Sequence, residues 1–179
     1  MKTIQIDEHI LLKEVELSDA PDLFQAIDSQ RTYLREWLPF VDLTLEVADT
    51  EKYIRSIVTA PPESRDRTFI IRYEGLFAGL IGLKTIDRVN KKTEIGYWLS
   101  EKYQQKGIMT ASVKSLVDFA FRELHLHRIQ IKCGAGNIRS KKIPQRLHFQ
   151  LEGIERDGEL LSDGRFTDLE TYSLLNERE

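Results

Sequence analysis

Residues 93–123 restrict the fold more than any other stretch, because their hydrophobic pattern changes from that of a strand to that of a helix. Residues 94–99 form an apolar and aromatic run typical of a strand. A polar loop follows at 100–109, and a helix is predicted from Thr110, whose hydroxyl is suited to cap the first-turn amides. The apolar residues of this helix recur at i, i+3, i+4, i+7, i+8 and i+11, and they are Val113, Leu116, Val117, Ala120, Phe121 and Leu124.

A glycine-containing loop that leads into a helix N-terminus is typical of an anion site. It presents several backbone N–H groups to one point, and the helix dipole adds partial positive charge there. A Walker-type phosphate loop needs lysine and then Ser or Thr after its second glycine, whereas Lys106-Gly107 has the reverse order. A dinucleotide fingerprint needs three glycines in the first strand-to-helix turn, and this loop has only Gly107. The sequence therefore predicts a phosphate site of another kind.

The flanking segments define the expected sheet. Strands are predicted at 10–15, 68–73, 76–84 and 93–99, and the short turns between the last three make those strands antiparallel. The alternating run 127–133 follows the central helix, and this crossover makes it parallel to 93–99. Strands at 149–153 and 168–175 close the chain, and helices are predicted around 18–27, 49–58 and 137–147.

The expected fold class is α+β, in a single domain of residues 1–179. It has a mixed central sheet with an antiparallel N-terminal half, one parallel βαβ junction and a C-terminal hairpin, covered by helices.

Composition narrows the class of protein. The net charge of −3 does not favour a nucleic-acid binder. The single cysteine, Cys133, excludes an intramolecular disulfide, and no cluster of residues has metal-ligand spacing. We see neither a signal peptide nor an uncharged run of the ~18 residues that a membrane span needs. We therefore expect a cytoplasmic protein without a metal and without nucleic-acid or membrane partners.

Residues 94–99 and 104–110 together resemble motif A of the GNAT acetyltransferases. That motif, Arg/Gln-x-x-Gly-x-Gly/Ala, is matched by Gln104, Gly107 and Met109. Residues 94–99, with the sequence Glu-Ile-Gly-Tyr-Trp-Leu, and residues 35–40 are similar to the corresponding segments of the RimJ/RimL branch. This branch contains N-terminal acetyltransferases of ribosomal proteins. Residues 137–140 resemble the Asn-x-x-Ser segment of that branch, and the resemblance covers nearly the whole chain.

Three residues depart from the pattern of the family. Met109 replaces a small residue, and His148 replaces the glycine before Phe149. Pro144 stands where many members carry a tyrosine acid, so no such tyrosine is carried over to this chain.

The resemblance implies the GNAT fold and acetyl-CoA as cosubstrate. The pyrophosphate would lie on the amides of 105–109 and on the helix N-terminus, and Asn137 would hold the pantetheine arm. The backbone N–H of Trp98 or Leu99 would polarise the thioester carbonyl. Whether the side chains of Gln104 and Lys106 contact phosphate or solvent stays open. The candidate cofactor-binding residues are Tyr97, Trp98, Leu99, Gln104, Gln105, Lys106, Gly107, Ile108, Met109, Thr110 and Asn137.

Acetyl transfer needs a neutral amine as the nucleophile, and the CoA thiolate must be able to leave. A peptide α-amine has a pKa of ~7.7–8.0, so a modest base suffices, whereas a lysine at ~10.4 needs more help. Glu94 is the candidate base, directly or through a water, and the alternative is a carboxylate in solvent or in an ion pair. Ser140 is the candidate proton donor to the thiolate, and the alternative is a helix cap. Cys133 lies on an apolar strand face, where a core residue is favoured over an acyl-carrying nucleophile.

The aromatic residues Tyr33 and Trp37 belong either to the core or to one wall of the acceptor slot, and they are the candidate substrate-binding residues. The implied function is acetyl transfer by direct attack of an amine, with the N-terminal α-amine of a protein, a ribosomal protein for example, as acceptor. Two alternatives stay open: an N-acetyltransferase for polyamines or aminoglycosides, and a non-catalytic acyl-CoA-binding module. The aromatic segment is compatible with a homodimer.

Overall fold

The computed structural model of the chain describes residues 2–62 and 65–177. In this part of the chain, eight strands form one sheet in the order β1-β2-β3-β4-β5-β6-β8-β7. The strands are β1 (Thr3–Gln5), β2 (Ile10–Glu14), β3 (Arg67–Tyr73), β4 (Leu76–Asp87), β5 (Lys92–Leu99), β6 (Arg128–Gly134), β7 (Gln150–Leu160) and β8 (Phe166–Leu175). The α-helices are α1 (Ala20–Asp28), α2 (Arg31–Leu34), α3 (Val47–Val58), α4 (Ile108–Arg122) and α5 (Ile138–Arg146). Short 3-10 helices lie at η1 (Leu17–Asp19), η2 (Pro39–Leu43) and η3 (Glu101–Tyr103).

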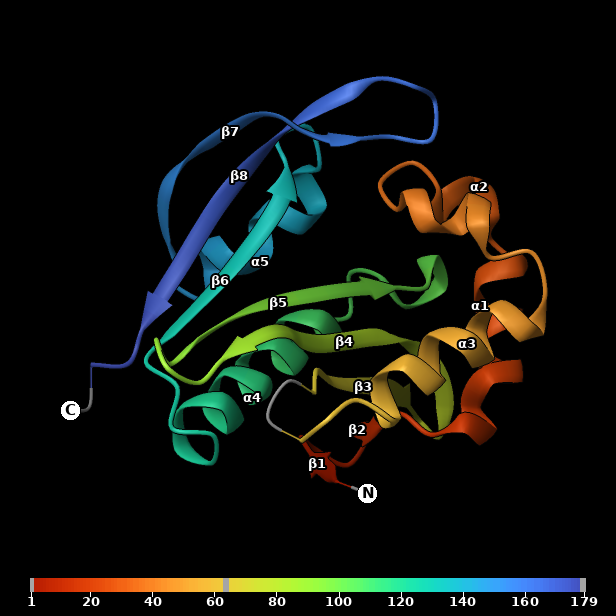
Figure 1. Cartoon of the computed structure of the whole chain (residues 1–179), viewed down its shortest axis with the longest axis horizontal. Helices are drawn as coiled ribbons and strands as arrows, with labels where there is room; N and C mark the ends of the chain where they lie inside the picture. Colours follow the sequence, from red (N-terminus) through yellow and green to blue (C-terminus); the bar gives the residue numbers. More distant parts are fainter. Residues whose placement is uncertain (1, 63–64, 178–179) are drawn as a thin grey trace.

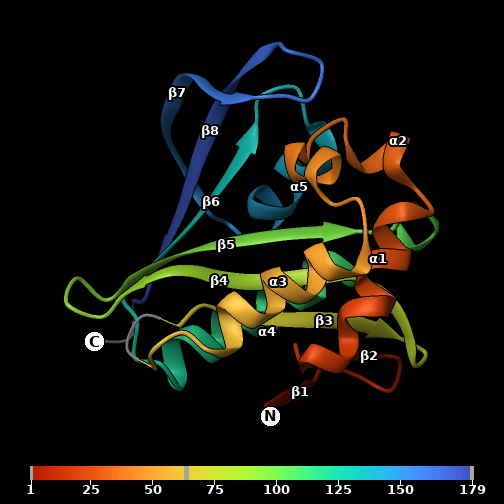
Figure 2. The same cartoon turned by 45° about the vertical axis from the view of Figure 1, so that its right-hand side comes forward.

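The pairing of β5 with β6 is parallel and short. It joins only three residue pairs, the last of which is Glu94 with Gln130, and every other strand pairing in the described sheet is antiparallel. Beyond Glu94 the two strands diverge, as Figures 1 and 2 show. The mixed sheet, its parallel junction and its C-terminal hairpin are confirmed, and the divergence opens a gap between the halves of the sheet.

Helices cover both faces of the sheet (Figure 2). Alternation along β3 directs Phe69 and Ile71 into the core that contains Leu116 of α4. Ile70 points to the opposite face and joins the core that contains Ile54 of α3. All of these side chains are fully buried, and each contributes about 1.5–3 kcal/mol to stability by the burial of apolar surface.

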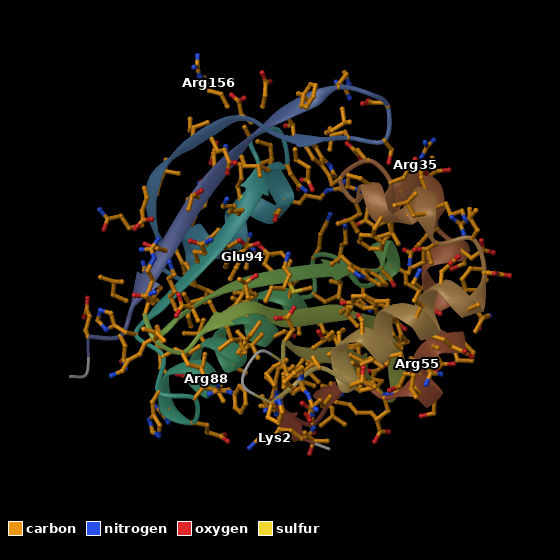
Figure 3. The ribbon with its side chains drawn as sticks, viewed as in Figure 1. Lys2, Arg35, Arg55, Arg88, Glu94 and Arg156 are labelled. Carbon is orange, nitrogen blue, oxygen red and sulfur yellow. The ribbon has the colours of Figure 1, made fainter. Side chains whose placement is uncertain are left out.

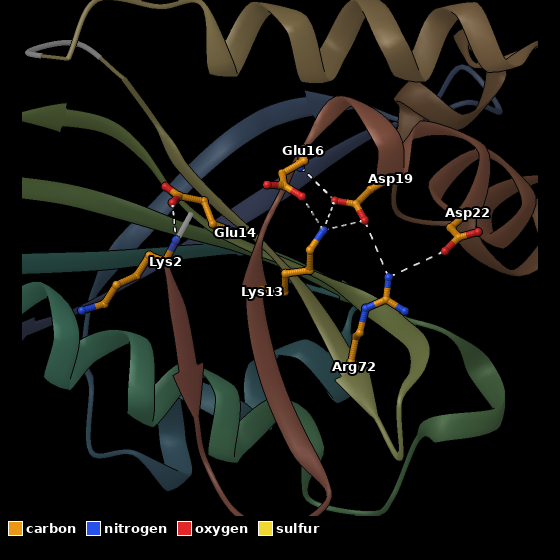
Figure 4. A network of polar contacts seen from close by, with 7 residues as sticks. All are labelled: Lys2, Lys13, Glu14, Glu16, Asp19, Asp22 and Arg72. Atoms are coloured by element: carbon orange, nitrogen blue, oxygen red, sulfur yellow. Dashed lines mark hydrogen bonds and ion pairs between the residues drawn. The ribbon is translucent and has the colours of Figure 1, made fainter.

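A polar network fixes the start of α1 to the sheet (Figure 4). The buried carboxylate of Asp19 lies 2.7 Å from the ammonium of Lys13 on β2 and 3.6 Å from the guanidinium of Arg72 on β3. Arg72 also lies 3.7 Å from Asp22 in α1. Two cations thus balance the negative charge of Asp19, as a buried carboxylate requires. The chain continues from α1 into α2, which carries Tyr33.

Several boundaries differ from the sequence-based predictions; β4, for example, ends at Asp87 rather than at residue 84. The central helix begins at Ile108 with Gly107 as its N-cap, so the prediction of Thr110 as the cap was wrong. Gly107 adopts the left-handed conformation, with φ of 75°, and starts the helix earlier than a threonine cap would. The strand β7 reaches Leu160, well beyond the predicted residue 153, and β1 was not predicted. Most of β7 is exposed on both faces, so its sequence lacks the alternation that marks a half-buried strand.

Candidate functional site

A cleft of about 520 Å³ lies between α2, the end of β5, the start of α4, and α5. Its lining brings together most of the residues that the sequence singled out, while Lys106 and Glu94 are not part of it. The predicted residues in the lining are Tyr33, Trp37, Tyr97, Trp98, Leu99, Gln104, Gln105, Gly107, Ile108, Met109, Thr110, Asn137 and Ser140.

The N-terminus of α4 has no side-chain cap. Its first helical hydrogen bond runs from the N–H of Ala111 to the carbonyl of Gly107 at 3.0 Å, so the N–H groups of the first three helical residues have no partner within the helix. The side chains of Ile108 and Met109 are buried in the core. These residues therefore present mainly their backbone to the cleft, and the bulk of Met109 does not obstruct the loop.

The loop before α4 is shaped like an anion cradle. Gln105, with φ of 63°, and Gly107, with φ of 75°, both lie in the left-handed region, and such turns aim successive N–H groups inward. The side chains of Gln104 and Lys106, whose contacts could not be predicted from the sequence, lie in different places. The Gln104 amide donates to the phenol oxygen of Tyr33 in the cleft. The Lys106 ammonium instead lies 5.0 Å from the ring centre of Tyr73, outside the cleft lining.

The end of β5 offers one backbone amide to the cleft. The N–H of Ser100 donates to the carbonyl of Ala78 on the β4 side at 2.8 Å, and the carbonyl of Trp98 points at Gly79 of β4. Because backbone groups alternate along a strand, the intervening Leu99 directs its N–H and carbonyl away from β4. Its carbonyl accepts a hydrogen bond from Tyr33 at 3.3 Å. Of the two candidate amides, the geometry favours that of Leu99.

Ser140 sits in the first turn of α5. Its N–H donates to the side-chain oxygen of Asn137, the N-cap residue, at 3.0 Å. Its hydroxyl donates to the phenol oxygen of Tyr97 at 3.2 Å, and that phenol donates to the carbonyl of Ser140 at 3.2 Å. Burial raises the pKa of Tyr97 well above its usual value, so the phenol stays neutral. Two candidate cofactor residues and a candidate catalytic residue thus form one connected cluster.

Glu94 lies at the point where β5 and β6 diverge (Figure 3). Its carboxylate is 3.4 Å from the ammonium of Lys84 and accepts from the side-chain amide of Gln130 at 3.1 Å. The structure therefore has the ion-pair arrangement that the sequence analysis left open. Alternation along β5 places Glu94 on the face of the sheet opposite to Tyr97 and Ser140. The two candidate catalytic residues thus approach the divergence of the strands from opposite faces.

A second carboxylate, that of Glu159 on β7, was not predicted from the sequence. Desolvation of its carboxyl group raises the pKa of Glu159, the charge of Lys84 lowers it, and the charge of Glu94 raises it. A carboxyl group whose pKa is raised by its surroundings and by a second carboxylate is a candidate for a functional site. Glu159 stands 65 residues from Glu94 in the chain and lies in an exposed strand, so no local sequence signal marks it.

The two candidate substrate residues meet different parts of the cleft. The ring of Trp37 lies against the end of β6, where a Cβ atom added at Gly134 would come within 2.8 Å of it and one at Gly136 within 3.0 Å. The glycines thus make room for this ring. Burial raises the pKa of Tyr33, while the nearby charge of Arg139 lowers it. Both aromatic residues are half-buried walls of the cleft.

Cys133 is buried, with 5% of its surface exposed, in the core between the sheet and α4. Burial, together with the charge of Glu170, raises the pKa of its thiol to about 11. A thiol in this state is a poor nucleophile.

Within residues 2–62 and 65–177, no group of three or more His, Cys, Asp or Glu residues is arranged to hold a metal ion. None of the helices in the described part of the chain is long and apolar enough to span a bilayer.

Comparison with known proteins identifies the family. The model of the acetyltransferase (GNAT) domain matches residues 9–150. The chain belongs to the GNAT acetyltransferase family. This GNAT N-acetyltransferase is 35% identical over 181 residues to the putative ribosomal N-acetyltransferase YdaF of Bacillus subtilis (strain 168), with 98% of this chain and 96% of YdaF covered. It is 30% identical over 172 residues to the ribosomal-protein-serine acetyltransferase of Escherichia coli (strain K12), with 96% of each chain covered.

A solved structure shows the same fold along the whole chain. It is that of RimL, a ribosomal L7/L12 alpha-N-protein acetyltransferase, in complex with coenzyme A. The TM-score is 0.94 at 26% identity, and the match covers 99% of this GNAT chain and 100% of RimL. The predicted GNAT fold and the RimL-like branch are therefore confirmed.

Proposed function

We propose that this GNAT protein transfers an acetyl group from acetyl-CoA by direct attack of an amine, and that the acceptor is the N-terminal α-amine of a protein. The observation that carries the proposal is the uncapped start of α4, whose free amides line a cleft that leads to the divergence of β5 and β6. The named activities of the B. subtilis and E. coli relatives make a ribosomal protein the first acceptor to test.

The lining of the cleft offers groups that suit acetyl-CoA, which supports this proposal. The amides of residues 105–110 would hold the pyrophosphate through neutral hydrogen bonds and the dipole of α4. Asn137 would hold the pantetheine arm at the N-terminus of α5. The N–H of Leu99 would donate to the thioester carbonyl oxygen, where negative charge develops. When bound, acetyl-CoA supplies an activated acetyl thioester, and the protein supplies its position and the proton transfers.

The acceptor amine would enter on the face of the sheet that carries Glu94. A carboxylate there takes the proton of the amine, directly or through a water. Glu94 is the base expected from the sequence, and Glu159 is a second candidate, because its pKa is raised toward neutral pH. We propose that Glu159 accepts the proton and that the charge of Glu94 raises its pKa, with Glu94 itself as the alternative base.

The thiolate departs on the other face, beside Ser140 and Tyr97. A thiol of this kind has a pKa of about 8.5, so the thiolate is a tolerable leaving group without strong acid catalysis. The Ser140 hydroxyl can still donate to the sulfur once its hydrogen bond to Tyr97 breaks. Ser140 therefore assists the departure rather than enabling it.

The test is the release of CoA from acetyl-CoA in the presence of a panel of amines. The panel contains peptides with the N-termini of ribosomal proteins, the same peptides with blocked N-termini, and polyamines and aminoglycosides. Turnover of the free peptides alone supports the proposal. Turnover of the small amines alone replaces it with the small-molecule alternative. Tight binding of acetyl-CoA without any CoA release identifies a non-catalytic binding module.

A further inference from the structure

The helix α5 carries a row of cations along one wall of the cleft. Arg139, Lys142 and Arg146 follow at i, i+3 and i+7, so they lie on one face of the helix, and all three line the cleft. The protein as a whole has a net charge of −3, so this row of three cations contrasts with its overall negative charge.

In the described part of the chain, no carboxylate forms an ion pair with these three cations, whereas 11 other Lys and Arg residues are ion-paired. Lys141, their neighbour on α5, lies 2.5 Å from the carboxylate of Glu170. Among the described residues, by contrast, neither Lys142 nor Arg146 has an ion-pair partner, and Arg139 faces the phenol of Tyr33. The cleft lining also contains the carboxylate of Glu36, whose negative charge acts on Arg165.

The arrangement carries a small electrostatic cost, about 0.2–0.5 kcal/mol for a like-charge pair, that a bound anion would relieve. Lys142 and Arg146 stand at i and i+4, where like charges repel each other. Arg139 lies in the first turn of α5, where the helix dipole disfavours a cation. The dipole does favour Arg146 in the last turn, but it explains neither of the other two.

The pyrophosphate of the donor does not need these cations, because the amides at the start of α4 already meet it. Coenzyme A carries a further phosphate, the 3′-phosphomonoester on its ribose, which has a higher charge than a diester and lies at the end remote from the sulfur. Ser140 marks the sulfur end of α5, and Arg146 lies six residues further along the helix, about 9 Å away along its axis. Full charges on long side chains suit an exposed dianion.

We propose that Lys142 and Arg146 bind the 3′-phosphate of coenzyme A and make the enzyme select donors that carry it. The inference rests on the proposed function. It predicts that acyl groups come from free CoA thioesters, and that dephospho-CoA thioesters and acyl groups on pantetheine alone are poor donors.

Calorimetric titrations with coenzyme A and with 3′-dephospho-CoA test this selection. One charge-assisted contact with phosphate changes affinity by about tenfold or more, so we expect the wild-type protein to bind coenzyme A at least about tenfold more tightly than the dephospho compound. In Lys142→Gln/Arg146→Gln, the ratio of the two affinities should fall to about one, with the affinity for 3′-dephospho-CoA unchanged.

The matched control is Lys114→Gln/Arg122→Gln, which removes two exposed cations from α4, outside the cleft lining. This control should keep the wild-type ratio. Higher salt should reduce the ratio of the wild-type protein, because ions screen exposed charges.

The inference and the proposed function can fail separately. A wild-type affinity ratio near one, or an unchanged ratio in Lys142→Gln/Arg146→Gln, overturns the inference, even if acetyl transfer to peptides proceeds. A ratio that depends on the two cations supports the inference, even if no amine is acetylated. Equal turnover of acetyl-CoA and acetyl-dephospho-CoA at low donor concentration also overturns it, while it leaves the acetyltransferase function standing.

Discussion

The phenol of Tyr97 donates its hydrogen bond to the backbone carbonyl of Ser140 at 3.2 Å. In an uninterrupted helix this carbonyl would accept from the N–H of the residue four positions later, which here is Pro144 and has no N–H. The carbonyl can only accept, so the single phenol proton is committed to it, and the Ser140 hydroxyl must donate to the phenol oxygen. The proline inside α5 thus sets the direction of the hydrogen bonds beside the thioester.

This arrangement predicts coupling between Tyr97 and Pro144. Tyr97→Phe should cost about 1–2 kcal/mol of stability, because it leaves the carbonyl of Ser140 without a partner. In the Pro144→Ala background the alanine N–H satisfies that carbonyl, so the same substitution should cost about 1 kcal/mol less. Urea denaturation of the four proteins measures the difference. Equal costs in the two backgrounds would show that the carbonyl does not link these residues.

Ser140→Ala should lower kcat by only about tenfold, below the usual range of about 100- to 10,000-fold for proton donors, because the CoA thiolate leaves readily. The KM for acetyl-CoA should change little, since the capping contact between Asn137 and the N–H of residue 140 does not involve the hydroxyl. Steady-state kinetics at saturating peptide check both values. An unchanged kcat would show that Ser140 has only a structural role in the cap of α5, the alternative to proton donation.

Gly107→Ala tests the anion cradle. No atom lies within 4 Å of the added Cβ, so the substitution acts only by disfavouring the left-handed backbone, at a cost of about 1–2 kcal/mol. The matched control is Gly75→Ala, a turn glycine with φ of 78° and equally open space, outside the cleft lining. Both should lower thermal stability to a similar degree. Only Gly107→Ala should raise the KM for acetyl-CoA, and equal KM values in both variants would argue against phosphate binding at this loop.

Cys133→Ala should retain kcat within about twofold. With a pKa of about 11, roughly one thiol in ten thousand is ionised at neutral pH, too few for an acyl-carrying nucleophile. Intact-mass spectrometry of the wild-type protein mixed with acetyl-CoA, without an acceptor, should detect no acetylated protein. An acetylated species that forms and then disappears when peptide is added would contradict direct attack.

Local patterns predicted much of this molecule, because each strand and helix keeps its own periodicity. The loop before α4 and the cap at Asn137 are both local features of the sequence. Contacts between distant segments escaped prediction, since they depend on strand register and on the twist of the sheet. The approach of Trp37 to Gly134 joins segments almost one hundred residues apart, and nothing near either residue indicates it.

The carboxylates of Glu94 and Glu159, whose charges interact, give the sharpest test of the chemistry. A base must be deprotonated to act, so kcat should rise with pH through the pKa of Glu159. Glu159→Gln should remove this rise and lower kcat by about 100-fold, at the low end for general catalysis because an α-amine needs only a modest base. The measurement is kcat at saturating peptide, since kcat/KM also reports the free α-amine, which titrates at ~7.7–8.0.

Glu94→Gln should instead move the rise in kcat to lower pH. The charge of Glu94 raises the pKa of Glu159, so its removal lowers that pKa. The same change frees Lys84 from its ion pair, and the charge of Lys84 lowers the pKa of Glu159 as well, so both effects have the same sign. Glu152→Gln is the control, because Glu152 lies on the same strand and pairs with Arg128 at 2.5 Å, and its profile should match the wild type. If Glu94→Gln abolishes the rise while Glu159→Gln keeps it, Glu94 is the base itself, as its place in the sequence first suggested.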